Sequence, residues 1–251
     1  MDSGLYAAYT GLLARTQALD TAANNLANAG TAGFRAQRDY FSGVLAGGID
    51  QNPETASQVG QSVNGFGVLG GDRLDLGQGE IRSTGNPLDL ALEGQGFFAI
   101  QTNNGIRYTR DGAFSRSATG ILQTAQGEPV LDPNQKPITI PTGSIYVAPD
   151  GSISVSTSDG SVIVGQVGAF DFTEKSVLTA EGANRFSANG AKPIPATVSI
   201  EQGSIEGANE DAVHGTMQLV LVQRQAEMMQ KALSVFNNDF DKTASDDLPR
   251  V

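Results

Sequence analysis

The chain of 251 residues contains no cysteine, no tryptophan and a single histidine, His214. Without cysteine it forms neither disulfides nor thiolate metal sites, and one histidine cannot build a multi-histidine metal site. Positive charge is also scarce, since 16 Lys and Arg stand against 27 Asp and Glu and give a formal net charge of −11. Nucleic acids and anionic membranes bind basic surfaces, so neither is an expected partner.

Long apolar runs are absent as well. None reaches the roughly 18 residues of a membrane span, so we expect no membrane insertion. The first residues, MDSGLYAAYTG, lack the basic segment followed by an apolar segment that marks a cleaved signal peptide. Any export is therefore expected to use a route that needs no such peptide.

Two patterns are typical of cofactor or catalytic sites, but both lack the required context. Gly65, Gly67 and Gly70 match the dinucleotide-binding spacing, yet no apolar strand precedes them and no helix start follows. His214 could belong to a Ser-His-Asp hydrolase, but no serine lies in the strand–turn–helix context of a nucleophile. The sequence predicts a protein that is not an enzyme and that binds no cofactor or metal.

The N-terminal region carries a regular apolar pattern. Leucines recur every seven residues within 3–27, which draws one stripe along a helix. Only Arg15 and Asp20 are charged between Ser3 and Phe34, so the remaining surface suits contact with other helices. The predicted contact residues of this stripe are Leu5, Tyr9, Leu12, Leu19 and Leu26.

This helix is expected to end within the stretch ANNLANAGTAGFR, residues 23–35. Asn28 and Gly30 tolerate the left-handed conformation that terminates helices, and Gly33 offers a second flexible point. Amides serve as hydrogen-bonding groups at a close helix contact, and an aromatic ring anchors the turn. The residues predicted for these roles are Asn24, Asn25 and Phe34, and Asn28 is predicted to belong to the same assembly interface.

The C-terminal region repeats the pattern. Asn209, Glu210 and Asp211 are expected to supply an N-cap and an acidic first turn. From Ala212 onward, small and apolar residues recur every three or four positions, which is a coiled-coil-like signal. The predicted contact residues are Leu219, Val222, Arg224, Ala226, Met229, Leu233, Phe236 and Phe240.

The region 83–205 is typical of antiparallel β-structure. Turn dipeptides such as Asn104-Gly105 and Asp150-Gly151 separate short alternating strands, which predicts a small barrel or sandwich. The fold class is therefore α+β, with terminal helices pairing in a coiled-coil-like inner domain. The predicted division is 1–34 for the N-terminal helix and turn, 35–82 for an extended connector, 83–205 for the β domain, and 206–251 for the C-terminal helix and tail.

Helices of this length are marginal when isolated in water. We therefore expect both ends to be largely disordered in a free monomer and to fold when subunits stack. A closed trimer would cover the helices as well as an open helical assembly would. A secreted trimeric β-domain module, such as an adhesin or a phage-tail-like binder, is therefore an alternative.

Six segments resemble the axial proteins of the bacterial flagellar hook–basal body, specifically its rod proteins: residues 23–35, 84–100, 108–114, 120–124, 202–211 and 222–233. The resemblance implies a non-enzymatic subunit that leaves the cell through the flagellar type III export apparatus. It implies helical polymerisation with copies of itself and with other rod and hook proteins, into a drive shaft that spans the periplasm and passes torque to the hook for motility. The single compact β region is unlike the hook protein. The N-terminal residues and the length favour the proximal rod over the distal rod.

Overall fold

The computed structural model describes residues 2–42, 68–157 and 160–246, and side chains within 9–39, 73–157 and 160–235. The chain divides into two compact units. The helical unit comprises Met1–Ala27, Gln37–Arg73 and Ala212–Val251, and the β unit comprises Asn28–Ala36 and Leu74–Asp211. Residues 28–36 thus belong with the β structure, whereas the sequence grouped most of them with the N-terminal helix.

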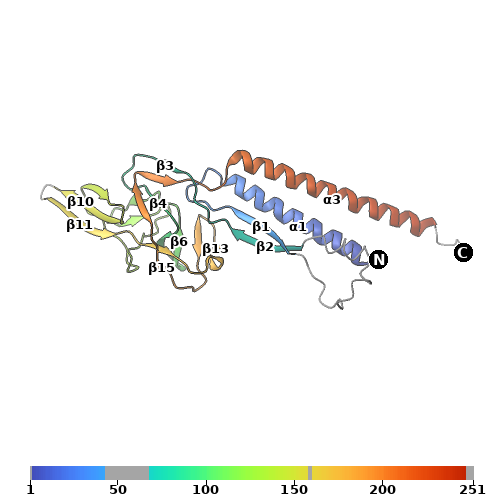
Figure 1. The fold of residues 1–251 in the computed structure, drawn as a ribbon, viewed down its shortest axis with the longest axis horizontal. Coiled ribbons are helices and arrows are strands. Elements are labelled where there is room, and N and C mark those ends of the chain that lie inside the picture. The colour runs from blue at the N-terminus through green and yellow to red at the C-terminus, as the bar shows by residue number, and fades with distance from the viewer. Residues whose placement is uncertain (1, 43–67, 158–159, 247–251) are drawn as a thin grey trace. The chain divides into compact units, whose positions relative to one another are not determined.

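The helical unit contains both predicted terminal helices, α1 (Asp2–Ala27) and α3 (Ala212–Asp246). They pack side by side (Figure 1), and β1 (Gln37–Ser42) contacts α1 and pairs with β2 (Val68–Leu74). Neither helix, within the described residues, has an apolar stretch long enough to cross a membrane.

The start of α3 differs from the expectation. The helix begins at Ala212 and has no acidic residue in its first turn, so the predicted acidic first turn is wrong. Asn209 does not cap the helix, because it lies three residues before Ala212. Its side-chain oxygen instead accepts a hydrogen bond from the Ala36 amide at 2.8 Å. The Asn209 amide nitrogen donates to the Asp75 carbonyl at 2.8 Å, so this side chain joins loops of the β unit.

The β unit consists of small antiparallel sheets, which confirms the α+β class, while a barrel or sandwich stays a prediction. The largest sheet has the order β13–β14–β6–β5–β12–β15, and a three-stranded sheet has the order β11–β10–β9. Strands β16 and β4, β17 and β3, and β7 and β8 form pairs. The elements of this unit are β3 (Ile81–Ser83), β4 (Leu90–Glu93), β5 (Phe97–Thr102), β6 (Gly105–Thr109), β7 (Ser115–Arg116), β8 (Leu122–Gln123), β9 (Ser144–Val147), β10 (Ser152–Thr157), β11 (Gly160–Gln166), β12 (Ala169–Asp171), the 3-10 helix η1 (Lys175–Val177), β13 (Thr179–Ala180), β14 (Arg185–Ser187), β15 (Ile194–Pro195), β16 (Ser199–Gln202) and β17 (Ser204–Glu206).

The core of the β unit is organised around β5, which is buried on both faces. Phe98 and Ile100 belong to one hydrophobic cluster, whereas Phe97 and Ala99 belong to a second. Successive side chains of a strand point to opposite faces, so this one strand joins both clusters. The predicted turn at Gly105 follows directly, with φ of 98° at this glycine.

Candidate functional site

The buried face of α1 consists of small residues. Gly11, Ala14 and Ala18 are buried and lie three or four positions apart, so they form one stripe along the helix. Helix axes approach more closely where the contacting side chains are small. This stripe is therefore suited to close packing inside the helical unit.

The predicted leucine stripe lies about 100° further round the same helix, because it is displaced by one residue. Leu12, Leu19 and Leu26 are half-buried, so they flank the small-residue stripe. Tyr9 is 50% exposed and Leu13 is 60% exposed. The side chain of the remaining predicted residue, Leu5, lies outside the described side chains.

On α3 the predicted stripe is the buried face. Gly215, Ala226 and Leu233 are buried, which places the 3-4 spacing of the sequence on the inner side of the helix. Among the other predicted residues, Leu219, Val222 and Met229 are half-buried, Arg224 is exposed, and the side chains of Phe236 and Phe240 lie outside the described ones.

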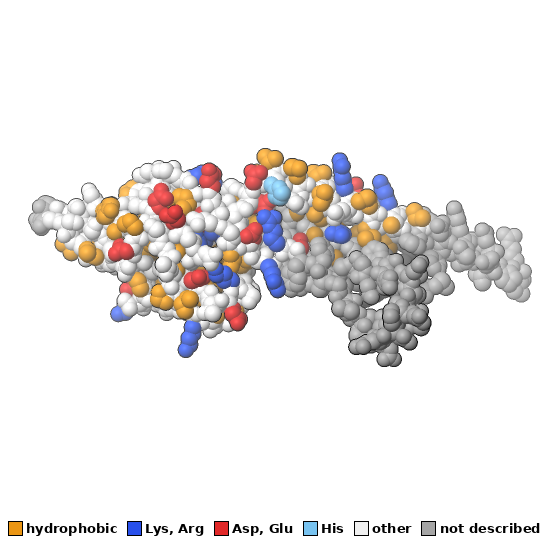
Figure 2. All heavy atoms as spheres, viewed as in Figure 1, with side chains coloured by type: hydrophobic (Ala, Val, Ile, Leu, Met, Phe, Trp, Pro, Cys, Tyr) orange, Lys and Arg blue, Asp and Glu red, His pale blue; other side chains and the backbone are white. Residues whose placement is uncertain are grey.

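A second apolar surface runs along α3 and was missed by the sequence analysis. Figure 2 shows apolar side chains following this helix, interrupted by basic ones. Part of it lines a shallow groove of about 530 Å³, and Arg224 also lines this groove. We call it the outer face of α3; its residues are between 43% and 69% exposed and are Val213, Met217, Val220, Leu221, Met228 and Val235. The 4-3 spacing from Val213 through Met217 to Val220 was the available signal.

Asn25 holds the end of α1 to the segment that follows it. Its amide nitrogen donates to the Gln37 carbonyl at 2.7 Å, and the Gln37 amide donates to its side-chain oxygen at 2.9 Å. Thr21 donates to the Asp39 carboxylate at 3.0 Å. The Asn25 amide thus binds β1 within the chain rather than a helix, whereas Asn24 is exposed.

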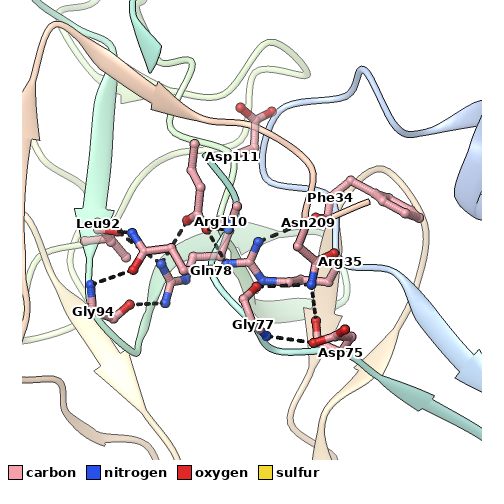
Figure 3. Close-up of polar contacts among 12 residues, drawn as sticks. Phe34, Arg35, Asp75, Gly77, Gln78, Leu92, Gly94, Arg110, Asp111 and Asn209 are labelled. Atoms are coloured by element: carbon pink, nitrogen blue, oxygen red, sulfur yellow. Dashed lines mark hydrogen bonds and ion pairs between the residues drawn. The ribbon is translucent and has the colours of Figure 1, made fainter. Parts of the chain in front are cut away.

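The left-handed residue after α1 is Gly33, with φ of 68°; neither Asn28 nor Gly30 has a positive φ, so that prediction is wrong. The reason is a close approach of backbones, because a Cβ at Gly33 would lie 2.2 Å from the Asp111 nitrogen. Phe34 is half-buried, and Figure 3 shows its ring pointing away from the polar cluster beside it.

That polar cluster joins four separate segments of the β unit. Glu206 accepts a hydrogen bond from Arg35 at 2.6 Å and another from Arg110 at 2.9 Å. It also accepts the Gly79 amide at 2.7 Å. Figure 3 shows both guanidinium groups pointing into the same space. The side chains of Arg35 and Glu206 are completely buried.

Two guanidinium groups share one carboxylate here. Burial lowers the pKa of Arg110, the Glu206 carboxylate opposes this shift, and the charge on Arg35 adds to it. Arg110 also donates to the carbonyls of Leu92 and Gly94. Because the cluster is closed to solvent, we infer that it serves the fold rather than a reaction.

The pairing of these residues was not predicted from the sequence. Arg35 and Glu206 lie 171 positions apart, and no local pattern links them. The available signal was only that Arg35 and Glu206 fall inside segments that resemble the rod proteins.

The sequence also offered candidate catalytic and cofactor residues. His214 is exposed in the first turn of α3. Within the described ranges, no three His, Cys, Asp or Glu side chains gather where they could hold a metal ion. Gly65 and Gly67 of the glycine pattern lie outside the described residues, and Gly70 is in β2.

Fold and site together define a class of protein: an α+β chain whose accessible feature is the apolar surface of terminal helices. Comparison with known families agrees with this class. Residues 91–164 match the flagellar hook protein FlgE/F/G D1 domain, and residues 5–35 match the flagella basal body rod protein family.

Relatives match along most of the chain. A flagellar basal-body rod protein FlgF from Caulobacter vibrioides is 34% identical and covers 93% of both chains. FlgF from Mesorhizobium japonicum is also 34% identical over 90% of each, and FlgG from Bacillus subtilis is 30% identical over 92% of this chain and 93% of its own. This chain belongs to the family of flagellar basal-body rod proteins, which is structural and not enzymatic.

Proposed function

We propose that this chain is a structural subunit of the flagellar basal-body rod and polymerises helically with copies of itself and with related axial proteins. Family membership supports the proposal, and the outer face of α3 carries it. Contiguous apolar surface of this kind marks interaction sites. A neighbour that covers a Leu, Val or Met side chain contributes up to about 1.5–3 kcal/mol for each one fully buried.

The contact joins two different surfaces. One is the outer face of α3; the other is the exposed side of α1 with Tyr9 and Leu13. When two unlike surfaces of the same chain meet, the contact is head-to-tail and can continue into an open helical filament. Coiled-coil-like pairing of α1 with α3 inside each subunit would present both surfaces. The predicted interface residues that are half-buried, such as Leu12 and Leu19, would border the contact.

Within the rod, this chain is assigned to the proximal, FlgF type. The support is that the relatives from Caulobacter and Mesorhizobium, each 34% identical, carry that name. The distal, FlgG type is the second candidate, because FlgG from Agrobacterium fabrum is 33% identical. Expression in strains lacking either protein separates them, and restored swimming only in the strain without FlgF supports the proximal assignment.

The proposal includes export through the flagellar type III apparatus and a position in the periplasmic part of the basal body. The family supports this placement. In cells whose export apparatus is disabled, the chain should stay in the cytoplasm. Its appearance in the periplasm of such cells would contradict this part of the proposal.

The main test is electron microscopy of basal bodies from a strain that carries Leu221→Ser as its only copy. Loss of the apolar side chain from the outer face of α3 should leave the rod incomplete. Ile163→Ser in the edge strand β11 is a matched control, because this side chain is also exposed. Equal rod assembly in both variants would contradict the proposal, and a discrete trimer in sedimentation would favour the secreted β-domain module.

A further inference from the structure

Residues 31–36, which we call the strap, are attached to the rest of the β unit mainly by polar contacts. The Gly33 amide donates to the Glu206 carbonyl at 2.8 Å. The Ala36 backbone amide donates to the Asn209 side-chain oxygen at 2.8 Å, and the Asn209 backbone amide donates to the Phe34 carbonyl at 3.3 Å. This side of the strap therefore lies along residues 206–209.

Two further donors hold the strap. The Asp75 amide donates to the Ala36 carbonyl at 2.8 Å, and the Asn184 side chain donates to the Ala32 carbonyl at 2.7 Å. Ala183 and Asn184 both have left-handed φ, 47° and 55°. This conformation is unfavourable for alanine, and strained backbone of this kind tends to occur at clamps and switch regions.

The hydrophobic core of the β unit is formed without the strap. Neither hydrophobic cluster contains a residue from 28–36. Segments with few apolar contacts open at a lower free energy than the core they rest on. The strap fits this description, because only Ala36 among its apolar residues is fully buried.

The buried charges are a second reason why the rest of the β unit does not depend on the strap. Without Arg35, the Glu206 carboxylate and the Arg110 guanidinium form a one-to-one pair, and Arg110 keeps its bonds to the Leu92 and Gly94 carbonyls. With Arg35 present, two cations share the carboxylate, and the Nε atoms of Arg35 and Arg110 make no hydrogen bond in the described part of the chain. Closing the strap therefore adds both the attraction between Arg35 and Glu206 and the repulsion between Arg35 and Arg110.

We infer that the strap is a latch, a segment that opens and closes while the rest of the β unit stays folded. The Arg35–Glu206 ion pair holds this latch closed. Opening frees these six residues from the β unit, while the two hydrogen bonds between Asn25 and Gln37 keep the ends of the segment joined. The inference depends on the strap contacts alone and not on the identity of the neighbours.

Amide hydrogen exchange on the full-length protein tests this latch. In the unmodified chain, the Gly33 and Ala36 amides should exchange at least tenfold faster than the hydrogen-bonded amides of β5 and β10. Arg35→Met should accelerate the strap amides at least another tenfold and leave the sheet amides unchanged. Arg116→Met, at an exposed arginine of β7, is the matched control and should change neither.

A second variant keeps the test independent of the buried charges. Asn184→Gly removes the contact with the Ala32 carbonyl and tolerates the left-handed φ of this position, so it should also accelerate only the strap amides. If strap and sheet amides exchange together, or if Arg35→Met unfolds the whole β unit, the strap is part of the core and the inference is wrong.

Discussion

At the scale of single residues, Glu206 is the point where separate segments of the β unit meet. Its carboxylate binds a guanidinium from the strap, a guanidinium from the end of β6 and the backbone amide of Gly79. Its own carbonyl accepts the Gly33 amide. A neutral side chain of the same shape would keep some of these bonds but would leave two buried cations without a counter-charge.

We therefore expect Glu206→Gln to destabilise the β unit by about 3–5 kcal/mol, the range measured when one partner of a buried ion pair is removed. Urea unfolding measures the change. Glu80→Gln is the matched control, because the Glu80 side chain is 81% exposed and lies 3.9 Å from Arg82. Its unfolding midpoint should stay unchanged. Equal midpoints for the two variants would show that the cluster contributes little to stability.

Asp111 provides a prediction about pH. Burial raises the pKa of its carboxyl, the Ala113 amide opposes the shift and Asp89 adds to it. The folded state therefore holds this proton more tightly than the unfolded state, whose value is about 3.9. From that pH up to the raised folded-state pKa, the contribution of Asp111 to stability falls as pH rises.

Asp111→Asn should accordingly raise the free energy of unfolding at pH 7, and the gain should vanish in acid. Asp150→Asn should do the reverse, because hydrogen bonds from Ser152 lower the pKa of Asp150, whose stabilising contribution is present at neutral pH and lost in acid. Urea unfolding across pH 3 to 7 measures both differences. A gain for Asp111→Asn that grew toward acid would contradict the assignment.

At the scale of elements, α1 and α3 each have an inner and an outer side. The helices themselves were predictable from the sequence, because seven-residue and 3-4 spacings specify a helical stripe. The buried side of α1 was not, because leucines and alanines stand next to each other, as in Ala18-Leu19. Which of these side chains is buried depends on how closely another element packs against α1. The spacing of residues along the sequence does not determine that packing distance.

Pairings across long stretches of chain were equally beyond the sequence. The turn at Gly105 was predictable, because a local dipeptide determines it. The place of residues 28–36 in the β unit depends on Arg35 meeting Glu206, and only the folded chain brings them together. The outer face of α3 had a signal in its spacing, but the stronger inner stripe concealed it.

The two sides of α1 predict different effects of substitution in dilute protein. Ala18→Leu overpacks the inner side and should cost about 1–3 kcal/mol, which circular dichroism detects as a lower melting midpoint of the helical signal. Leu13→Ser on the exposed side should leave this midpoint unchanged. Equal midpoints for the two variants would contradict a packed inner side of α1 in dilute protein.

At the scale of the whole molecule, the two units have different tasks in this account. The β unit has its own hydrophobic core and its own buried ion pairs, so it should fold independently. The helical unit presents the apolar surfaces that the proposed assembly requires. The chain therefore separates stability from association.

A fragment of residues 28–211 tests this separation. It retains the strap and both hydrophobic clusters, so it should unfold cooperatively in urea and sediment as a monomer. It should also fail to enter basal bodies, because both helices are missing. A molten fragment, with secondary structure but no cooperative transition, would show that the helices are part of the β unit's core.

The most direct measurement of the central claim uses the absence of cysteine, since any introduced cysteine is a unique probe. Maleimide labelling of Leu13→Cys and Met217→Cys reports access to the exposed side of α1 and to the outer face of α3, and Ala125→Cys reports an exposed turn of the β unit. The account predicts that positions 13 and 217 label readily in dilute monomer and at least tenfold more slowly in isolated basal bodies, relative to position 125. Equal relative labelling in both states would contradict it.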